Sequence, residues 1–257
     1  MSNPPGQSAT AVPDNEEILS LDLEEDDFLY RIRRNSRIVL YSYRVLSKLR
    51  KILRWEEEWN TLTVRRSSQG VESSPNKSPP HGLDLRQIDI PDAIFVDLLD
   101  LTTVSRISDR ISCVKHGRES RILKVARFKH EIPALQQEVA VYSNLTLSGF
   151  PHAPKFIGFV YEETKFRVVG FLIESITGKP PGVQNLRDYT ETVRLLHAYG
   201  IVHGDLNKYN FLITEHGAKV FDFENAVVQG NVDPETAENE IETLAVKLED
   251  ESGIGKR

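Results

Sequence analysis

The chain has 257 residues, 39% of them apolar, which is enough to bury the core of one or two globular domains. Its formal net charge is −6 and acidic residues gather near the N-terminus, so the composition argues against nucleic acid as a partner. A single cysteine, Cys113, excludes an intrachain disulfide and a cysteine-rich zinc site, and it fits a reducing compartment.

The N-terminal residues have neither a signal-peptide pattern nor the composition of a folded segment. Residues 1–18 are rich in Pro, Ser, Asn and Gly, and we expect them to be disordered. They lack the basic and apolar regions of a secretory signal, and no later stretch has the roughly 18 uninterrupted apolar residues of a membrane span. We therefore expect an intracellular protein, cytoplasmic or nuclear, without a membrane span.

Residues 19–66 have the pattern of a small extension made of a β-hairpin and a helix. Two β-rich runs flank the polar turn at Arg34-Asn35-Ser36, which predicts the hairpin. Residues 45–55 then form a basic amphipathic run, and the basic face is either solvated or a contact surface for an acidic membrane surface or a protein partner. Residues 67–82 are rich in Ser and Pro, which predicts a linker and a domain boundary.

A second folded region is expected over 97–257. Its first half predicts strands at 104–108, 111–115 and 121–128, followed by a hairpin of strands at 156–162 and 166–174. Between them, a helix is expected to begin near Pro133, a residue that suits the first helical turn. Three apolar side chains would share one face of this helix: Leu135, Val139 and Tyr142.

The second half of this region predicts two further helices around another hairpin. The first helix ends at Gly200 and has four apolar residues at helical spacing: Leu186, Tyr189, Val193 and Leu196. A hairpin of strands at 211–214 and 219–223 follows. The last helix is expected from about Glu235, with Asp233 as its cap and Pro234 in its first turn.

The segment between the helix and the hairpin carries the strongest chemical signal. Asp205 and Asn210 lie five residues apart in a loop, and Asp222 follows at the end of the hairpin. Phosphoryl transfer needs a base that orients the acceptor hydroxyl, and oxygen ligands that hold Mg²⁺ against a triphosphate. These three residues supply the groups that such a reaction requires.

The run from His203 to Asn210 has the form H-x-D-L-x-x-x-N, and Asp222-Phe223 supplies two of the three residues of D-F-G. It resembles the catalytic loop of the protein-kinase-like superfamily. The resemblance implies an α+β, bilobal fold with an antiparallel-sheet N-lobe and a mainly helical C-lobe, truncated here because few residues follow Asp222. It also implies ATP and Mg²⁺ as cofactors, with Asp205 as the catalytic base and Asn210 and Asp222 as metal ligands.

The same resemblance implies further nucleotide-binding residues before the catalytic loop. The family holds the α- and β-phosphates with a lysine on the third N-lobe strand, which a glutamate of the following helix fixes. Lys124 and Glu138 fit these positions, and the alternatives are Lys115 and Glu131. Glu174 falls where the hinge between the lobes offers backbone groups to adenine.

Several positions depart from the pattern of regulated protein kinases. The turn at residues 106–110 has no glycine, which puts close approach of its backbone to phosphate in doubt. Glu224 replaces the glycine of D-F-G, Gly204 replaces the arginine before the catalytic aspartate, and no A-P-E element follows. Asn207 replaces the usual lysine two residues after Asp205, and we assign it to the catalytic group. These features are similar to aminoglycoside and choline phosphotransferases and to small atypical kinases.

Three functions fit these residues. The first is an ATP- and Mg²⁺-dependent atypical protein kinase that phosphorylates a protein hydroxyl. The second is a small-molecule kinase of the aminoglycoside or choline type, favoured by His203-Gly204-Asp205 but lacking an evident acceptor subdomain. The third is a weakly active or inactive kinase-like module that binds a protein partner through residues 19–66.

Overall fold

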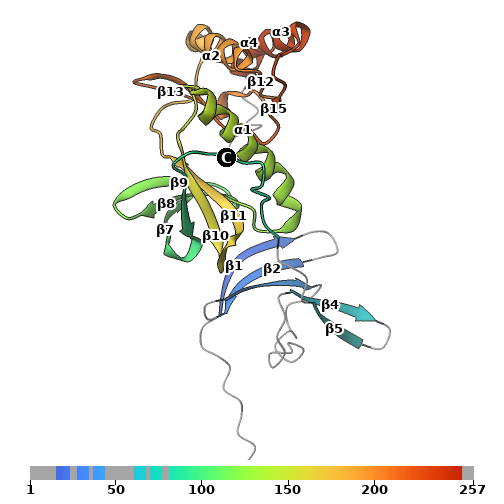
Figure 1. Ribbon diagram of the computed structural model, residues 1–257. Coiled ribbons are helices and arrows are strands. Elements are labelled where there is room, and N and C mark those ends of the chain that lie inside the picture. The colour runs from blue at the N-terminus through green and yellow to red at the C-terminus, as the bar shows by residue number, and fades with distance from the viewer. Residues whose placement is uncertain are drawn as a thin grey trace, which may run out of the picture. The chain divides into compact units, whose positions relative to one another are not determined.

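The computed structural model describes residues 16–23, 28–34, 37–43, 61–67, 70–76 and 81–250 (Figure 1). They belong to two compact units, Met1–Pro80 and His81–Arg257, which divide within the predicted linker at 67–82. The helix predicted at 45–55 and most of the predicted disordered N-terminus lie outside the described residues. Among the described helices, none has the length and apolar character of a membrane-crossing segment.

The first unit contains a five-stranded sheet whose strands lie in chain order. Its strands are β1 (Glu16–Leu23), β2 (Phe28–Arg34), β3 (Arg37–Tyr43), β4 (Thr61–Ser67) and β5 (Gly70–Asn76). Neighbouring strands are antiparallel except β3 and β4, which are parallel. The predicted hairpin is present, because β2 and β3 pair around the turn with Arg34 opposite Arg37.

This unit differs from the sequence prediction at both of its ends. Strand β1 begins at Glu16, inside the segment expected to be disordered, and β5 occupies part of the expected linker. The Pro and Ser content of β5 suggested a linker, but β5 is an edge strand of the sheet. An edge strand tolerates Pro75 because its outer side needs no backbone N–H for pairing.

The second unit begins with a six-stranded sheet in the order β6-β10-β11-β9-β8-β7. Its strands are β6 (Ile94–Asp97), β7 (Thr102–Arg106), β8 (Ile111–His116), β9 (Glu119–Val125), β10 (Phe156–Glu162) and β11 (Thr164–Glu174). Adjacent strands are antiparallel, except that β6 runs parallel to β10. The strands match the predicted ones within a few residues, apart from β6, which was not predicted.

The second unit begins earlier than the predicted start at residue 97: it starts at His81, and residues 81–96 belong to it. Leu83 and Ile90 are buried in its core, and the Leu83 N–H donates to the Val168 carbonyl at 2.8 Å. Val96 of β6 is also buried. The apolar side chains of this segment cover the sheet, which a linker composition does not reveal.

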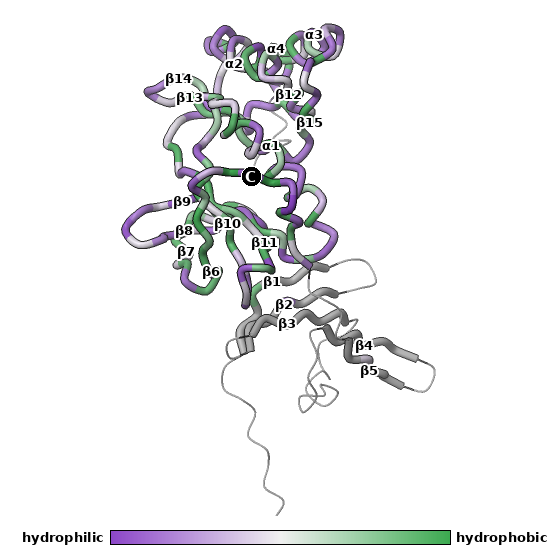
Figure 2. Tube along the Cα trace, viewed as in Figure 1, coloured by the Kyte–Doolittle hydropathy of each residue, from purple (hydrophilic) through white to green (hydrophobic). Residues whose placement is uncertain are grey.

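Helix α1 (Ile132–Ser148) covers the sheet with the predicted face. Pro133 lies in its first turn, and Leu135, Val139 and Tyr142 are buried. The Tyr142 ring meets the rings of three phenylalanines at centroid distances of 5.4–5.8 Å: Phe156, Phe171 and Phe223. Figure 2 shows hydrophobic residues along β10 and β11, which contribute buried side chains to this core.

The C-terminal part gathers three helices at one end of the unit (Figure 1). Its main elements are α2 (Leu186–Ala198), β12 (Ile201–Val202), β13 (Phe211–Thr214), β14 (Gly217–Val220), β15 (Val227–Val228), α3 (Pro234–Glu242) and α4 (Leu244–Glu249). Short 3-10 turns also occur in this unit, at Leu98–Asp100, Lys129–Glu131, Val183–Asn185 and Lys208–Asn210. Strands β12 and β15 pair with each other, as do β13 and β14.

Two C-terminal predictions need correction. The single last helix is divided at Thr243 into α3 and α4, although Asp233 caps α3 as expected by accepting from the Thr236 N–H at 3.0 Å. Strand β14 ends at Val220, so the chain leaves the hairpin before Asp222, which has a left-handed φ of 68°. The unit has the predicted α+β, bilobal kinase-like fold, with a sheet-rich N-lobe and a small, mainly helical C-lobe.

Candidate active site

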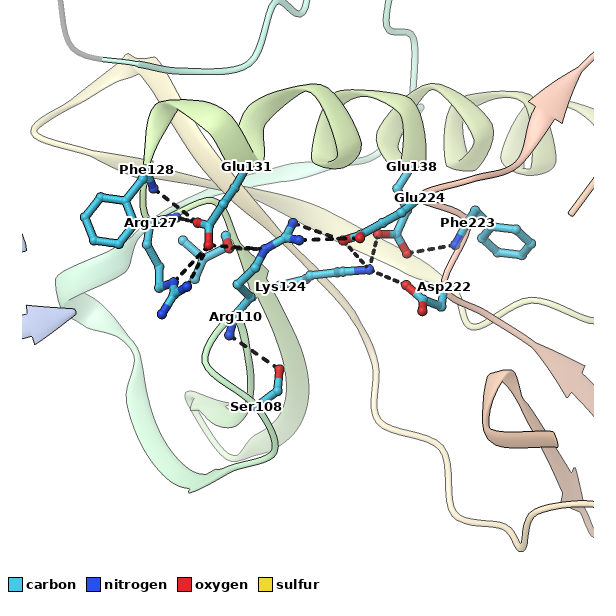
Figure 3. A network of polar contacts seen from close by, with 11 residues as sticks. Ser108, Arg110, Lys124, Arg127, Phe128, Glu131, Glu138, Asp222, Phe223 and Glu224 are labelled. Carbon is cyan, nitrogen blue, oxygen red and sulfur yellow. Dashed lines mark hydrogen bonds and ion pairs between the residues drawn. The ribbon is translucent and has the colours of Figure 1, made fainter. Parts of the chain in front are cut away.

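Lys124 lies at the centre of a buried polar network (Figure 3). Strand β9 carries it on the face opposite to that of Leu123 and Val125, and 5% of its side chain is exposed. Its Nζ atom lies 2.5 Å from Glu138 Oε2, 2.6 Å from Asp222 Oδ1 and 2.9 Å from Glu224 Oε1. One ammonium group therefore faces three carboxylates.

Glu138 connects helix α1 to the segment that follows the second hairpin. Its side chain is 2% exposed, and while Oε2 pairs with Lys124, Oε1 accepts a hydrogen bond from the Phe223 N–H at 3.2 Å. The carboxylate thus fixes the lysine and the backbone next to Asp222 at once. Its contacts tie β9, α1 and the Asp222 segment into one arrangement.

The structure places the alternative residues for this pair, Lys115 and Glu131, in other contacts. Glu131 accepts from the backbone N–H groups of Arg127 and Phe128 and pairs with the Arg127 side chain at 2.7 Å. Lys115 lies near the outer end of β8, opposite Ser120, and is exposed. The buried ion pair is therefore formed by Lys124 and Glu138.

The charges of this network shift one another's proton affinities. Burial by itself lowers the pKa of Lys124, but the three carboxylates outweigh it and the net pKa is raised. Burial raises the pKa of Glu138, and the nearby carboxylates of Asp222 and Glu224 add to this shift, although Lys124 opposes it. Burial also favours a raised pKa at Glu224, but Lys124 and Arg110 outweigh it and its pKa is lowered.

The loop that follows β12 places Asp205 beside Asn210. Asp205 is exposed, whereas Asn210 is buried. The amide nitrogen of Asn210 donates to the Asp205 carbonyl at 2.9 Å and lies 3.4 Å from its carboxylate. These bonds use the nitrogen of the amide, so its oxygen is the atom that a cation would meet.

His203 braces this loop as a neutral side chain. It is fully buried, and burial lowers its pKa. Its Nε2 lies 3.1 Å from the Phe221 carbonyl and its Nδ1 lies 3.3 Å from the Asp205 N–H. These partners assign the proton to Nε2, and they link the Asp205 loop to the residue before Asp222.

Glu240 of α3 anchors the same loop from its other side, a contact that was not predicted from the sequence. Its carboxylate accepts from the backbone N–H of His203 at 3.2 Å and of Gly204 at 2.7 Å, and it pairs with His197 at 2.7 Å. Burial would raise the pKa of Glu240, but these donors outweigh it and lower the pKa.

The backbone conformation at Gly204 explains why no arginine precedes Asp205. Its φ is 78°, and a Cβ at this position would lie 2.5 Å from the Asn225 carbonyl oxygen. Any side chain would be strained and would collide with backbone. Asn207, expected in the catalytic group, is the cap of the 3-10 turn: its Oδ1 accepts from the Tyr209 N–H at 2.9 Å.

A cavity of about 410 Å³ adjoins the charged network. Its walls combine apolar side chains of both lobes with the polar residues described above. The lining residues are Ile107, Ile111, Ile122, Lys124, Glu138, Pro154, Ile173, Glu174, Ile176, Pro180, Tyr209, Asn210, Leu212, Phe221 and Asp222. Glu174 thus lies at the cavity, while Asp205 and Asn207 do not line it.

Arg110 and Glu224 complete the network on the side of the β7–β8 turn. The Arg110 Nη2 atom lies 3.0 Å from Glu224 Oε1, and its Nη1 lies 3.4 Å from Oε2 (Figure 3). The replacement of glycine by Glu224 was visible in the sequence. Its ion pairs with Lys124 and Arg110 were not, because they join segments far apart in the chain.

Comparison with known proteins agrees with this geometry. Residues 182–242 match the RIO domain family (RIO1), an atypical protein kinase-like family, over a minority of the chain. The matched segment includes α2, the Asp205 loop, Asp222 and α3. The match supports placement in the kinase-like superfamily, and a comparison with curated proteins found no match.

Proposed function

We propose that this chain is an ATP- and Mg²⁺-dependent phosphotransferase that acts on a protein hydroxyl. The observation that carries the proposal is the contact of Asp222 with the buried Lys124–Glu138 pair, beside a cavity whose other lining residues are mostly apolar. Most binding cavities for small molecules combine apolar walls with a few placed polar groups in this way. The match to the RIO domain supports the kinase-like class of the reaction.

The residues of the site fit a nucleotide with its metal ion. Isoleucine and leucine side chains supply apolar walls for adenine, and Glu174 at the end of β11 lies where its backbone could meet the base. The carboxylates of Glu138, Asp222 and Glu224 bring oxygen atoms within 4.8 Å of one another, around Lys124 and, at Glu224, Arg110. This excess of negative charge and the oxygen ligands suit a divalent cation.

In this mechanism Asp222 and Asn210 would hold Mg²⁺, which would neutralise negative charge on the phosphates. Lys124, fixed by Glu138, binds the phosphates nearest the nucleoside. Asp205 orients the acceptor hydroxyl and takes its proton as the hydroxyl oxygen bonds to the γ-phosphorus and ADP leaves. Asn207 holds the turn that carries Asn210 and so acts by positioning.

A second function is favoured by one specific contact. Glu224 already pairs with Lys124 and Arg110, so the site is closed by its own carboxylate where a phosphate is expected. This contact favours a weakly active or inactive binding module. A protein partner for residues 19–66 belongs to that hypothesis, and an aminoglycoside- or choline-type acceptor remains the alternative substrate class.

The first test is the melting temperature with and without Mg·ATP. A ligand at 100 times its dissociation constant stabilises the folded state by about 2.7 kcal/mol, so a working site gives a measurable rise. We expect the rise to require Mg²⁺ and to vanish in Asp222→Asn. Asp188→Asn, which removes the same charge from an exposed position of α2, should keep it.

The second test concerns transfer itself. Labelled ATP should phosphorylate a protein acceptor, and Asp205→Asn should abolish the transfer while leaving the Mg·ATP-induced rise in melting temperature intact. ADP release stimulated by an aminoglycoside or choline instead would favour the small-molecule alternative. No rise even at millimolar nucleotide would move the binding module to first place.

A further inference from the structure

The β7–β8 turn covers the site, but its backbone N–H groups are already hydrogen-bonded within the hairpin. The N–H groups of Ile107 and Ser108 both donate to the Ile111 carbonyl, at 2.9 and 3.0 Å. The Arg110 N–H lies 3.4 Å from the Ser108 hydroxyl oxygen. Three backbone donors that a glycine-rich loop would offer to phosphate are therefore engaged within the turn.

The same turn supplies a cation in their place. The Arg110 backbone carbonyl accepts from the Val125 N–H at 3.0 Å, next to Lys124 on the same strand, so the base of the side chain is fixed to β9. Its guanidinium extends into the network, with 21% of the side chain exposed, and lies 3.9 Å from Glu131. Arg110 and Lys124 then meet at one carboxylate oxygen, Glu224 Oε1, at 3.0 and 2.9 Å.

The carboxylate of Glu224 thus occupies the point where two cations converge. Arginine binds carboxylate and phosphate oxygens with the same two-pronged geometry, and lysine binds either one as a point charge. A site that pairs an arginine and a lysine with a single carboxylate also presents the charges that a diphosphate group requires. A diphosphate carries more negative charge than one glutamate, so it complements the two positive charges of Arg110 and Lys124 better.

We propose that Arg110 is a phosphate-binding residue that replaces the backbone donors of a glycine-rich loop, and that Glu224 occupies its place until nucleotide phosphates displace it. The ligand class is the α- and β-phosphates of a nucleoside di- or triphosphate, so the inference rests on the proposed function. Phosphate binding then has to break the ion pairs of Glu224. This cost makes the affinity for nucleotide low and sensitive to residue 224.

The test is calorimetric titration of the full chain with Mg·ADP and, separately, with adenosine. Glu224→Gln keeps the size of the side chain and removes its charge, and we expect it to bind Mg·ADP at least tenfold more tightly than the wild type. Adenosine has no phosphate, so its affinity should change less than twofold. Glu224→Gly, which restores the D-F-G sequence, should behave like Glu224→Gln.

The role of Arg110 is tested in the Glu224→Gln variant, in which the competing carboxylate is absent. Adding Arg110→Ala to Glu224→Gln should weaken Mg·ADP at least tenfold and leave adenosine unchanged. Glu215→Gln removes the same charge from an exposed turn, where the side chain is 86% exposed, and should leave both affinities at wild-type values. Melting curves without ligand verify that each variant is folded.

The outcomes separate this inference from the proposed function. Equal affinity of wild type and Glu224→Gln for Mg·ADP would overturn the role of Glu224 and leave the nucleotide site standing. Weaker binding by Glu224→Gln would overturn it as well, because Glu224 would then contribute to holding the metal or the nucleotide. Binding of neither ligand by any variant would overturn the inference and the proposed function together.

Discussion

Removal of the Glu240 carboxylate should loosen the Asp205 loop while leaving the Lys124–Glu138–Asp222 network in place. Glu240 accepts from two backbone N–H groups and from His197, and 12% of its side chain is exposed. Hydrogen bonds to a charged group contribute about 1.5–3 kcal/mol each when buried. The exposed Gly204 N–H can bind water again, so we expect Glu240→Ala to lower the free energy of unfolding by about 2–4 kcal/mol.

Urea denaturation of wild type, Glu240→Ala and Glu238→Ala measures this effect. Glu238 is exposed on the same helix, and its removal should change the free energy of unfolding by less than about 0.5 kcal/mol. Because the pKa of Glu240 is lowered in the folded state, its contribution is complete above the unfolded pKa and declines as the pH falls through the folded pKa. The difference between wild type and Glu240→Ala should therefore shrink below about pH 4.5.

The same variant separates loop positioning from nucleotide binding. Glu240 touches neither Lys124 nor Asp222, so the Mg·ATP-induced rise in melting temperature should persist. Under the proposed function, transfer should fall by more than about tenfold, because a displaced Asp205 would lose its alignment with the acceptor. Glu240→Gln, whose amide oxygen can still accept one of the backbone bonds, should recover part of both losses. A Glu240→Ala protein as stable as the wild type would refute this account of the loop.

Three further substitutions test the surrounding network. Gly204→Ala should lower the free energy of unfolding by roughly 2 kcal/mol or more in urea denaturation, because its Cβ would meet the Asn225 carbonyl at a left-handed φ, and an unchanged midpoint would contradict the geometry. Lys124→Met should cost about 3–5 kcal/mol at pH 7, since it leaves the buried carboxylates of Glu138 and Asp222 without their ammonium partner, and less at lower pH, where Glu138, whose pKa is raised by burial, takes up a proton; a loss that is independent of pH would argue against its charge. His203 is neutral when folded, so the wild type should lose stability as the pH falls below the unfolded pKa of about 6.5, and His203→Gln should show a flatter pH profile between 5 and 6.5.

Elements with a strong local pattern were predictable from the sequence. The face of α1 that holds Leu135, Val139 and Tyr142 follows from helical spacing, and its start follows from Pro133. The grouping of Asp222 with Lys124 followed from resemblance to a family, not from spacing alone. Strand β6 and the break at Thr243 lacked such signals, because a four-residue strand and a short interruption depend on tertiary contacts.

The polar contacts of the site that we did not predict differ in whether the sequence carries a signal for them. Arg110 and Glu224 are 114 positions apart, so nothing near either residue reports their pairing. The absence of glycine at residues 106–110 and the presence of Glu224 were each visible as a departure from the family pattern. Only the fold shows that Arg110, in the turn without glycine, contacts Glu224. The two departures from the family pattern therefore form one ion pair.

Glu240 could have been found from the pattern of its own helix. Segment α3 is acidic throughout, but its apolar residues Ala237 and Ile241, with Leu244 just beyond, define one face. Glu240 lies three residues after Ala237 and four before Leu244, on that apolar face, whereas Glu238 lies off it. A carboxylate on a face that must be buried needs hydrogen-bond donors, and a catalytic loop with free backbone N–H groups can supply them. An acidic residue on the apolar face of a helix near such a loop is therefore a candidate anchor.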